Sequence, residues 1–378
     1  MRLLYVIDSL APGGAEISLR EMAPLLVHRG VELHVLPLGA DHTLASAIAD
    51  AGATIHGGEP AGSRLSNIRR VLKAIHDVGP DLVHTTLFES DIAGRIAARV
   101  AGLPASTSVV GDTYGDVRRS EVSPMRLGAA LALDKLTVGR STRFHAVSVS
   151  ISRAISVSLG VPSDRIEVVP RGRNPDSFPF RSIESRTAAR AQLGLPPGRD
   201  VILTVGRLDP AKGFNTLFEA FPRIVERHPN VLLILAGADG SASATLRAAA
   251  RAWPANVSFL GHRTDIPRLL TAADVFCFPS QREGSPGALI EALAVGCPII
   301  ASDIPPVLEI LGEGAQRVGT MTSAGNASNL GDALLWSLTG DSSLHSLALK
   351  GRAKFETLYT IGAVADRMIG FFHRVAGD

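Results

Sequence analysis

Two cations in the second half of the chain stand in a pattern suited to binding a phosphorylated ligand. Arg207 and Lys212 lie five positions apart in the glycine-bounded segment GRLDPAKGF, directly after the apolar run VILTV. A guanidinium can bond two phosphate oxygens at once and an ammonium adds a compact charge, so the pair favours a diphosphate. Loop cations are usually solvated, and a binding role is favoured here by the position after the first strand of a predicted parallel sheet.

Two carboxylates lie eight positions apart in the segment EGSPGALIEALAVG. Glu283 precedes a predicted helix, Pro286 suits its first turn, and Glu291 lies within it. Because this helix is apolar nearly all round, we expect it to be buried, and a buried carboxylate needs a partner. One carboxylate is then suited to the hydroxyls of a sugar and the other to those of a ribose. The alternatives are a structural ion pair for Glu291 and a solvated loop for Glu283.

A glycine turn follows the first apolar run, in the segment SLAPGGAE. Gly13 and Gly14 let backbone N–H groups approach a phosphate at the start of a helix. The spacing differs from GxGxxG and from GxxxxGK[ST], which disfavours a nicotinamide site and a P-loop. A simple strand-to-helix turn is the alternative.

Further polar residues follow predicted strands of the first half. His84 and His145 each end an apolar run, and core residues with satisfied hydrogen bonds explain them equally well. Asp112 and Tyr114, in the segment GDTYG, are candidates for lining an acceptor site, with an ordinary turn as the alternative. A basic stretch comes next, which is either a solvated face or a contact for anionic lipid headgroups. It comprises Arg118, Arg119, Arg126, Lys135, Arg140 and Arg143.

The elements that must position these residues alternate between short apolar runs and longer stretches of helical spacing, which predicts parallel sheets. The strands expected in the first half are 3–7, 33–36, 82–84, 106–109, 144–147 and 166–169. Those expected in the second half are 201–205, 231–236, 257–260, 275–278 and 299–301. A linker is predicted at about 172–198, and a closing amphipathic helix at about 361–376.

Length and composition narrow the class of protein. A chain of 378 residues exceeds one hydrophobic core, and 46% hydrophobic with 20% charged residues is typical of an α/β enzyme. A net charge of +2 is too mild to indicate a nucleic-acid partner. Cys277 and Cys297 lie in apolar runs and are expected to be core thiols, as in a reducing cytoplasm. The start of the chain predicts a first strand and not a signal peptide, and no apolar run has the length of a membrane span.

Taken together, the segments GGAE, VGRLDPAKGF, FLG and EGSPGALIEALAVGCPII resemble the retaining family-4 glycosyltransferases, or glycosyl transferases group 1, of the GT-B fold. The resemblance covers nearly the whole chain. It implies an α/β protein in which two Rossmann-like domains face each other across a cleft. Residues 1–175 would bind the acceptor and residues 176–360 the nucleotide-sugar donor, with a last helix at about 361–378 crossing back to the first domain.

The resemblance also implies roles for single residues. Arg207, Lys212 and Glu283 would be the catalytic set, the cations on the diphosphate and the carboxylate on the donor sugar. Glu291 would bind the ribose and the backbone of Gly14 a phosphate. The other donor-side residues would be Gly261, His262, Gly284, Ser285, Pro286 and Gly287. The acceptor side would comprise Gly13, Glu16, His84, Thr86, Asp112, Tyr114 and His145.

One position departs from the family pattern. Members often carry a second histidine in an HxH pair, and this chain has Thr86 there, after His84 and Thr85. In a front-face retaining mechanism the leaving phosphate can take the acceptor's proton, so activity does not require that histidine.

The predicted activity is retaining transfer of a hexosyl unit from a UDP- or GDP-linked sugar to a saccharide or lipid-linked acceptor. No cofactor or metal is expected, because the chain lacks an Asp-x-Asp pair and its cations can neutralise the leaving group. We expect a cytoplasmic protein whose membrane contact, at the inner face, would be peripheral. The alternatives are a sugar-nucleotide 2-epimerase and a non-catalytic nucleotide-sugar-binding protein.

Overall fold

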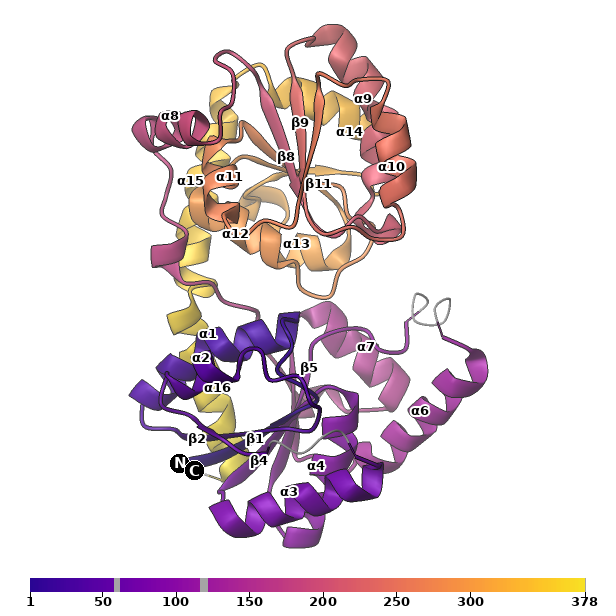
Figure 1. Cartoon of the computed structure of the whole chain (residues 1–378), viewed down its shortest axis with the longest axis vertical. Coiled ribbons are helices and arrows are strands. Elements are labelled where there is room, and N and C mark those ends of the chain that lie inside the picture. The colour runs from indigo at the N-terminus through magenta and orange to yellow at the C-terminus, as the bar shows by residue number, and fades with distance from the viewer. Residues whose placement is uncertain (58–61, 116–121, 378) are drawn as a thin grey trace. The chain divides into compact units, whose positions relative to one another are not determined.

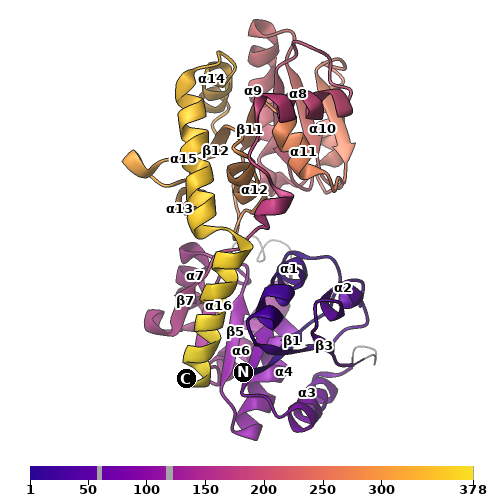
Figure 2. The same cartoon turned by 90° about the vertical axis from the view of Figure 1, so that its left-hand side faces the viewer.

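The structure is a computed structural model that describes residues 1–57, 62–115 and 122–377. The chain divides into two compact units (Figures 1 and 2). The first unit comprises Met1–Gly172 and Ile361–Asp378, and the second comprises Arg173–Thr360. The chain therefore leaves the first unit once and returns to it with its last helix.

The first unit is built on a parallel sheet of seven strands in the order β3-β2-β1-β4-β5-β6-β7. Its strands are β1 Arg2–Ile7, β2 Glu32–Pro37, β3 Thr54–Ile55, β4 Leu82–Thr86, β5 Ala105–Val109, β6 Arg143–Ala146 and β7 Ile166–Val168. The strand order reverses between β1 and β4. Loops after these two strands therefore diverge at one edge of the sheet, where open α/β sheets bind ligands.

Helices cover both faces of this sheet (Figure 1). One face carries α1 Gly14–His28, α2 Ala45–Ala49 and α16 Ile361–Ala376, and the other carries α3 Arg64–Val78 and α4 Phe88–Ala101. Two further helices, α6 Pro124–Val138 and α7 Val149–Leu159, enclose a smaller core with Phe144 of β6. A 3-10 turn, Ser163–Arg165, precedes β7.

Helix α16 confirms the prediction of a closing amphipathic helix that returns to the first domain. Its residues Val364, Met368, Phe371, Phe372 and Val375 recur at helical spacing and are all buried. They join one core with residues of β1 and α1. Because this stripe covers apolar surface of the first sheet, the last helix belongs physically to the first unit.

The second unit repeats the plan with a parallel sheet of six strands in the order β10-β9-β8-β11-β12-β13. Its strands are β8 Val201–Val205, β9 Leu232–Ala236, β10 Val257–Gly261, β11 Val275–Phe278, β12 Ile299–Ser302 and β13 Thr320–Thr322. Here the order reverses between β8 and β11. The α/β fold of two Rossmann-like domains is thus confirmed.

Helices again lie on both faces of the second sheet (Figure 1). One core includes residues of α9 Phe214–Arg227, α10 Ser243–Ala250 and α14 Ala327–Ser337. The other includes residues of α11 Ile266–Ala272, α12 Gly287–Val295, α13 Pro305–Leu311 and α15 Ser342–Leu358. The short 3-10 turns are Pro175–Ser177, Pro210–Lys212 and Gly314–Gln316.

The structure differs from the sequence-based expectation at three elements. The eleven predicted strands are present, but β3 and β13 are additional edge strands of two and three residues, too short to give an alternating pattern. The linker predicted at 172–198 is wrong over much of its length. Its central part forms α8 Ile183–Gln192, which begins with a capping box of Ser182 and Ser185 and packs on α11.

Candidate functional site

The clearest polar cluster lies at the reversal of strand order in the second sheet. Lys212 follows β8 and Glu283 follows β11, the two strands that flank this point. Lys212 Nζ lies 2.6 Å from Glu283 Oε1, and the Ser280 hydroxyl donates to the same oxygen at 2.8 Å. The predicted cation and the predicted carboxylate are therefore in direct contact, although 71 residues separate them in sequence.

Backbone geometry brings the two loops together. Gly213 has a φ of +67°, and a Cβ at this position would lie 1.9 Å from the carbonyl oxygen of Pro279. Only glycine accommodates both the positive φ and this approach. The N–H of Gln281 donates to the carbonyl of Ala211 at 2.9 Å, which ties the two loops next to the Lys212–Glu283 pair.

Arg207 lies in the same loop as Lys212 and is largely exposed, with 69% of its side chain accessible. Its Nε bonds Asp209 Oδ2 at 2.5 Å, and Asp209 Oδ1 in turn accepts from the N–H of Ser241 at 3.0 Å. An ion pair whose guanidinium is this exposed to solvent contributes about 0–1 kcal/mol. Little free energy is therefore lost when another anion replaces Asp209 as the partner of Arg207.

Glu291 forms an ion pair inside the second unit. Its Oε1 accepts from Nε of Arg173 at 2.7 Å, and both side chains are mostly buried. A Cβ on Gly287 would lie 2.2 Å from Nη2 of Arg173, so the glycine makes room for the guanidinium beside α12. The structural ion pair, which was the alternative reading of Glu291, is therefore present. Its role in binding the ribose stays a prediction. Sequence reasoning missed Arg173, which lies 118 positions away.

The other donor-side candidates lie at the same edge of the second sheet. Gly284 and Ser285 belong to the loop after β11, and Pro286 is the N-cap of α12 instead of its first helical residue, a shift of one position. Gly261 ends β10 and its carbonyl accepts from the N–H of Gly237 at 2.7 Å, while His262 is exposed. Their contacts with a donor stay predictions.

In the first unit, the glycine turn lies beside a buried carboxylate and an arginine. Gly13 is the N-cap of α1, and a Cβ there would lie 2.4 Å from Oε2 of Glu16. Burial, more than the nearby Asp8, raises the pKa of Glu16. A Cβ on Gly14 would lie 2.7 Å from Nη1 of Arg171, which follows β7. Sequence reasoning missed Arg171, whose only signal was its place after a strand in the segment PRGR.

The two histidine candidates are buried parts of one hydrogen-bonded chain. His84 Nδ1 lies 2.7 Å from the Ser106 hydroxyl, and its Nε2 lies 2.8 Å from Ser108 Oγ. That hydroxyl lies 2.7 Å from Nδ1 of His145, whose Nε2 lies 2.8 Å from the carbonyl of Val169. Burial lowers the pKa of both imidazoles, most strongly that of His84. His84 and His145 are thus neutral core residues whose ring nitrogens both have hydrogen-bond partners.

Thr86 ends β4 and is fully buried. Its hydroxyl lies 2.8 Å from the phenolic oxygen of Tyr5, and burial raises the pKa of that phenol to about 12. Thr86 and His145 both line a small cavity next to Arg171. The position at which the family resemblance leads one to expect a histidine is therefore occupied here by a hydroxyl that lies beside a neutral phenol.

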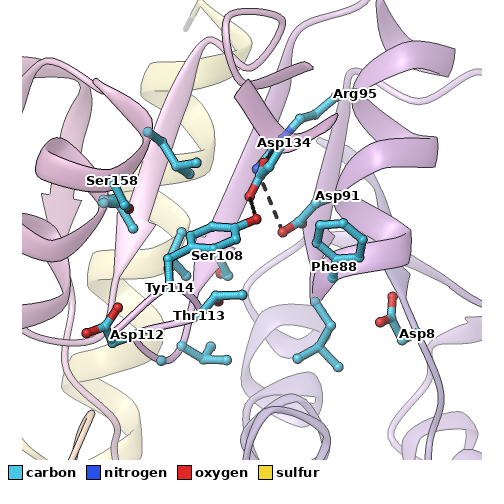
Figure 3. A pocket seen from close by; sticks show the side chains of 16 residues that line it. Asp8, Phe88, Asp91, Arg95, Ser108, Asp112, Thr113, Tyr114, Asp134 and Ser158 are labelled. Carbon is cyan, nitrogen blue, oxygen red and sulfur yellow. Dashed lines mark hydrogen bonds and ion pairs between the residues drawn. The ribbon is translucent and has the colours of Figure 1, made fainter. Parts of the chain in front are cut away.

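A larger pocket of about 360 Å³ lies at the carboxyl ends of β4 and β5 (Figure 3). Asp112 is exposed at its lining, whereas Tyr114 is buried and donates its hydroxyl to Asp134 Oδ2 at 2.8 Å. The guanidinium of Arg95 bonds the other oxygen of Asp134. The remaining lining residues are Asp8, Leu87, Phe88, Asp91, Ser108, Val109, Val110, Gly111, Thr113, Ile155, Ser158 and Leu159.

Asp91 gives this pocket an unusual proton donor. Its Oδ2 lies 3.7 Å from Nη2 of Arg95, too long for a close ion pair, and Arg95 already pairs with Asp134. Burial raises the pKa of Asp91 to about 8 despite the opposing charge of Arg95. At neutral pH the Asp91 carboxyl therefore carries a proton that it can donate to a hydroxyl-bearing ligand. The sequence offered no signal for this cluster beyond the (i, i+4) spacing of Asp91 and Arg95.

The basic stretch is only partly described. Arg118 and Arg119 lie outside the described residues. Arg126 and Lys135 are exposed on α6, Arg140 is exposed just after this helix, and Arg143 begins β6.

Within residues 1–57, 62–115 and 122–377, no group of three or more His, Cys, Asp or Glu side chains is arranged to hold a metal ion. Over the same ranges, none of the helices combines the length and the apolar character that a membrane span requires.

Two Rossmann-like units, each with one reversal of strand order, define the GT-B fold. The chain superposes on the crystal structure of HepE from Anabaena in complex with UDP with a TM-score of 0.83. That alignment covers 99% of this chain and all of that one, at 21% sequence identity, so it speaks for the fold alone.

Sequence comparisons identify the family. The model described as Glycosyltransferase Family 4 matches residues 12–177, and the model described as Glycosyl transferases group 1 matches residues 185–354. The chain belongs to this family, whose members transfer a sugar from a nucleotide sugar. The resemblance noted in the sequence is thereby confirmed.

Relatives with named activities cover much of the chain. A phosphatidyl-myo-inositol mannosyltransferase from Mycobacterium leprae is 28% identical over 97% of this chain and 94% of its own. A UDP-Gal:alpha-D-GlcNAc-diphosphoundecaprenol alpha-1,3-galactosyltransferase from Escherichia coli is 32% identical over 59% of this chain and 58% of its own.

Proposed function

We propose that this glycosyltransferase moves a hexosyl unit from a UDP- or GDP-linked sugar to a saccharide or lipid-linked acceptor, with retention of configuration and without a metal ion. The observation that carries the proposal is the contact of Lys212 with Glu283 at the strand reversal of the second sheet. An ammonium has three donors, so Lys212 can hold Glu283 with one and offer the others to phosphate oxygens. Glu283 then accepts from a hydroxyl of the donor sugar.

Arg207 supplies the second cation for the diphosphate. Because the Arg207 side chain is exposed, its partner Asp209 is readily exchanged for phosphate oxygens, and a guanidinium bonds two of them at once. Charge grows on the leaving nucleoside diphosphate during transfer, so both cations stabilise the transition state more than the bound donor. The departing phosphate takes the acceptor's proton, which needs no histidine at position 86.

The acceptor is proposed to bind in the pocket of the first unit. Its lining combines aromatic faces, Phe88 and Tyr114, with hydroxyl and carboxyl groups, a mixture suited to a saccharide (Figure 3). The activities of the two relatives, toward phosphatidyl-myo-inositol and toward a sugar on diphosphoundecaprenol, support a lipid-linked acceptor. Asp91 would donate its proton to an acceptor hydroxyl that is not the nucleophile.

The test of the donor site is a kinetic comparison of three variants. With saturating donor, Arg207→Ala and Lys212→Ala are each expected to lower kcat about 100-fold or more, because each removes a transition-state contact. Arg251→Ala, which removes an exposed cation elsewhere in the second unit, is the control and should leave kcat unchanged. Full rates in both site variants would disprove the assignment.

Two competing functions are separated by product analysis. A sugar-nucleotide 2-epimerase would convert the donor without an acceptor, and a binding protein would leave the donor intact even on prolonged incubation. A glycosyltransferase needs the acceptor for rapid turnover, and chelation of divalent metals should not slow it. A thermal-shift comparison of UDP and GDP would identify the base.

A further inference from the structure

The residue that joins β4 to α4 has a backbone conformation that leucine rarely adopts. Leu87 has a φ of +79° and a ψ of 160°, a region that only glycine enters without steric cost. Within residues 1–57, 62–115 and 122–377, every other residue with a positive φ is a glycine. A leucine in this region stores strain, so the surrounding structure must hold it in place.

Hydrogen bonds on both sides of Leu87 hold the strained segment. Before it, Thr86 is fully buried, and its hydroxyl lies 2.8 Å from the phenolic oxygen of Tyr5. After it, Asp8 Oδ1 accepts from the N–H of Ser90 at 2.7 Å and from the Ser90 hydroxyl at 2.6 Å. Asp8 follows β1, so these bonds cross the reversal of strand order between β1 and β4. The segment that contains Leu87 is therefore fixed at both ends.

The side chain of Leu87 is shared between a core and a pocket. It is partly buried and packs against the core that includes residues of α1 and α16. It also lines the pocket at the carboxyl ends of β4 and β5, as do Phe88 and Asp91 of the same segment. Figure 3 shows Phe88 and Asp91 next to each other at one side of this pocket. A glycine at position 87 would relieve the strain, but it would take an apolar side chain from this wall.

We propose that Leu87 is a specificity-determining residue of the acceptor site, whose strained backbone holds an apolar side chain against the C–H face of the acceptor ring. A pyranose or cyclitol ring combines such a face with hydroxyl groups at its edge. Leu87 and Phe88 match the face, and the Asp91 carboxyl matches a hydroxyl, so one wall recognises both parts of the ring. This role rests on the proposed function, because the pocket is assigned to the acceptor there.

The first experiment measures the strain by urea unfolding, followed by circular dichroism. Glycine normally lowers stability relative to alanine, because it loses more backbone freedom on folding. At position 87 the order should be reversed, with an unfolding equilibrium constant at least about threefold smaller for Leu87→Gly than for Leu87→Ala. The matched control is Arg69, exposed in the middle of α3, where Arg69→Gly should have an unfolding constant about fivefold larger than Arg69→Ala. The ordinary order at both positions would overturn the proposal.

The second experiment shows whether the side chain at position 87 faces the pocket or only fills the core. Leu87→Cys introduces a thiol there, and the native Cys277 and Cys297 are buried in the second unit. Iodoacetamide should alkylate Leu87→Cys at least about tenfold faster than Leu10→Cys, because Leu10 is fully buried in the same core while Leu87 also lines the pocket. Equal alkylation rates would assign Leu87 to core packing alone, against the proposal.

The third experiment measures transfer kinetics with two acceptor probes, one with a cyclitol ring and one with a pyranose ring. These are phosphatidylinositol with GDP-mannose as donor, and octyl N-acetyl-α-D-glucosaminide with UDP-galactose. Leu87→Ala and Leu87→Gly should raise the acceptor KM about tenfold and change kcat and the donor KM less than about twofold. A contact made equally in the ground state and the transition state affects KM alone. Leu87→Met keeps a long apolar side chain and should have an acceptor KM within about threefold of that of the unaltered chain.

The outcomes separate the role of Leu87 from the proposed function. If the unaltered chain transfers sugar and Leu87→Gly keeps its acceptor KM, the role of Leu87 is wrong and the proposed function stands. An unaltered chain that transfers to neither probe would contradict the proposed function, and the first two experiments would still decide the strain and the direction of the side chain. Circular dichroism of each variant establishes that it folds, and Leu87→Gly should fold because it relieves the strain.

Discussion

At the scale of single residues, the proton on Asp91 gives the first unit a distinct pH dependence. The folded-state pKa of about 8 lies above the ordinary aspartate value of 3.8, so between these pH values the folded chain holds a proton that the unfolded chain has released. This group therefore lowers the free energy of unfolding as pH rises from about 4 to 8. We expect Asp91→Asn to remove that loss and to raise stability by at least about 2 kcal/mol at pH 8, measured by urea unfolding.

The control for this comparison is Asp112→Asn, at an exposed carboxylate of the same pocket. It should leave the change of stability with pH close to that of the unaltered chain. The outcome against the prediction is an Asp91→Asn protein that loses stability between pH 4 and 8 as steeply as its parent. Glu16, whose pKa burial also raises, is not among the groups that shift the pKa of Asp91, so it contributes equally to all three proteins and cancels in the difference.

Single residues also differ in whether the sequence alone could predict their part in the site. Lys212 and Glu283 were predictable because each follows a strand in a recognisable segment, and strand order then brings them together. Arg173 beside Glu291 and Arg171 beside Gly14 were not predictable. Each partner lies more than 100 residues away in sequence, and no local pattern encodes such a contact. The proton on Asp91 likewise arises from burial by distant elements.

At the scale of elements, helix α16 tests how strongly one apolar stripe holds the first unit together. Phe372 is fully buried, and its ring packs edge-on against the His84 imidazole with 5.0 Å between the ring centroids. Phe372→Ala should lower the free energy of unfolding of this unit by about 3–5 kcal/mol, through lost transfer energy and the cavity left behind. The measurement is thermal unfolding followed by far-ultraviolet circular dichroism.

Asp366→Ala provides the matched control on the same helix. Asp366 is exposed and pairs with Arg29 at 3.2 Å, a surface contact worth at most about 1 kcal/mol. If both variants unfold at the same temperature, the packing of α16 does not stabilise the first unit. The prediction of this helix from sequence succeeded because its stripe is long. The two-residue strand β3 and the helix α8, placed in a predicted linker, lacked comparable signals.

At the scale of the whole molecule, the chain carries separate cores in its two units, and its tryptophans report on only one of them. Trp253 and Trp336 are the two tryptophans of the sequence, and both belong to the second unit. Trp253 packs edge-on against Phe221 with 5.5 Å between the ring centroids. Trp336, in α14, packs against the core on that face of the second sheet. Tryptophan fluorescence should therefore follow the unfolding of the second unit alone.

Tryptophan fluorescence can therefore show which unit binds the nucleotide. A nucleoside diphosphate at about 100 times its Kd stabilises the unit that binds it by about 2.7 kcal/mol, which is roughly 5–10 °C in a domain of this size. We expect UDP or GDP to raise the midpoint of the tryptophan transition, and to do so equally in the Phe372→Ala protein, whose damage lies in the other unit. Lys212→Ala should lose most of the shift. A nucleotide effect seen by circular dichroism but not by tryptophan would assign the donor to the first unit, and the diphosphate would then have to be bound there, near Gly14 and Arg171.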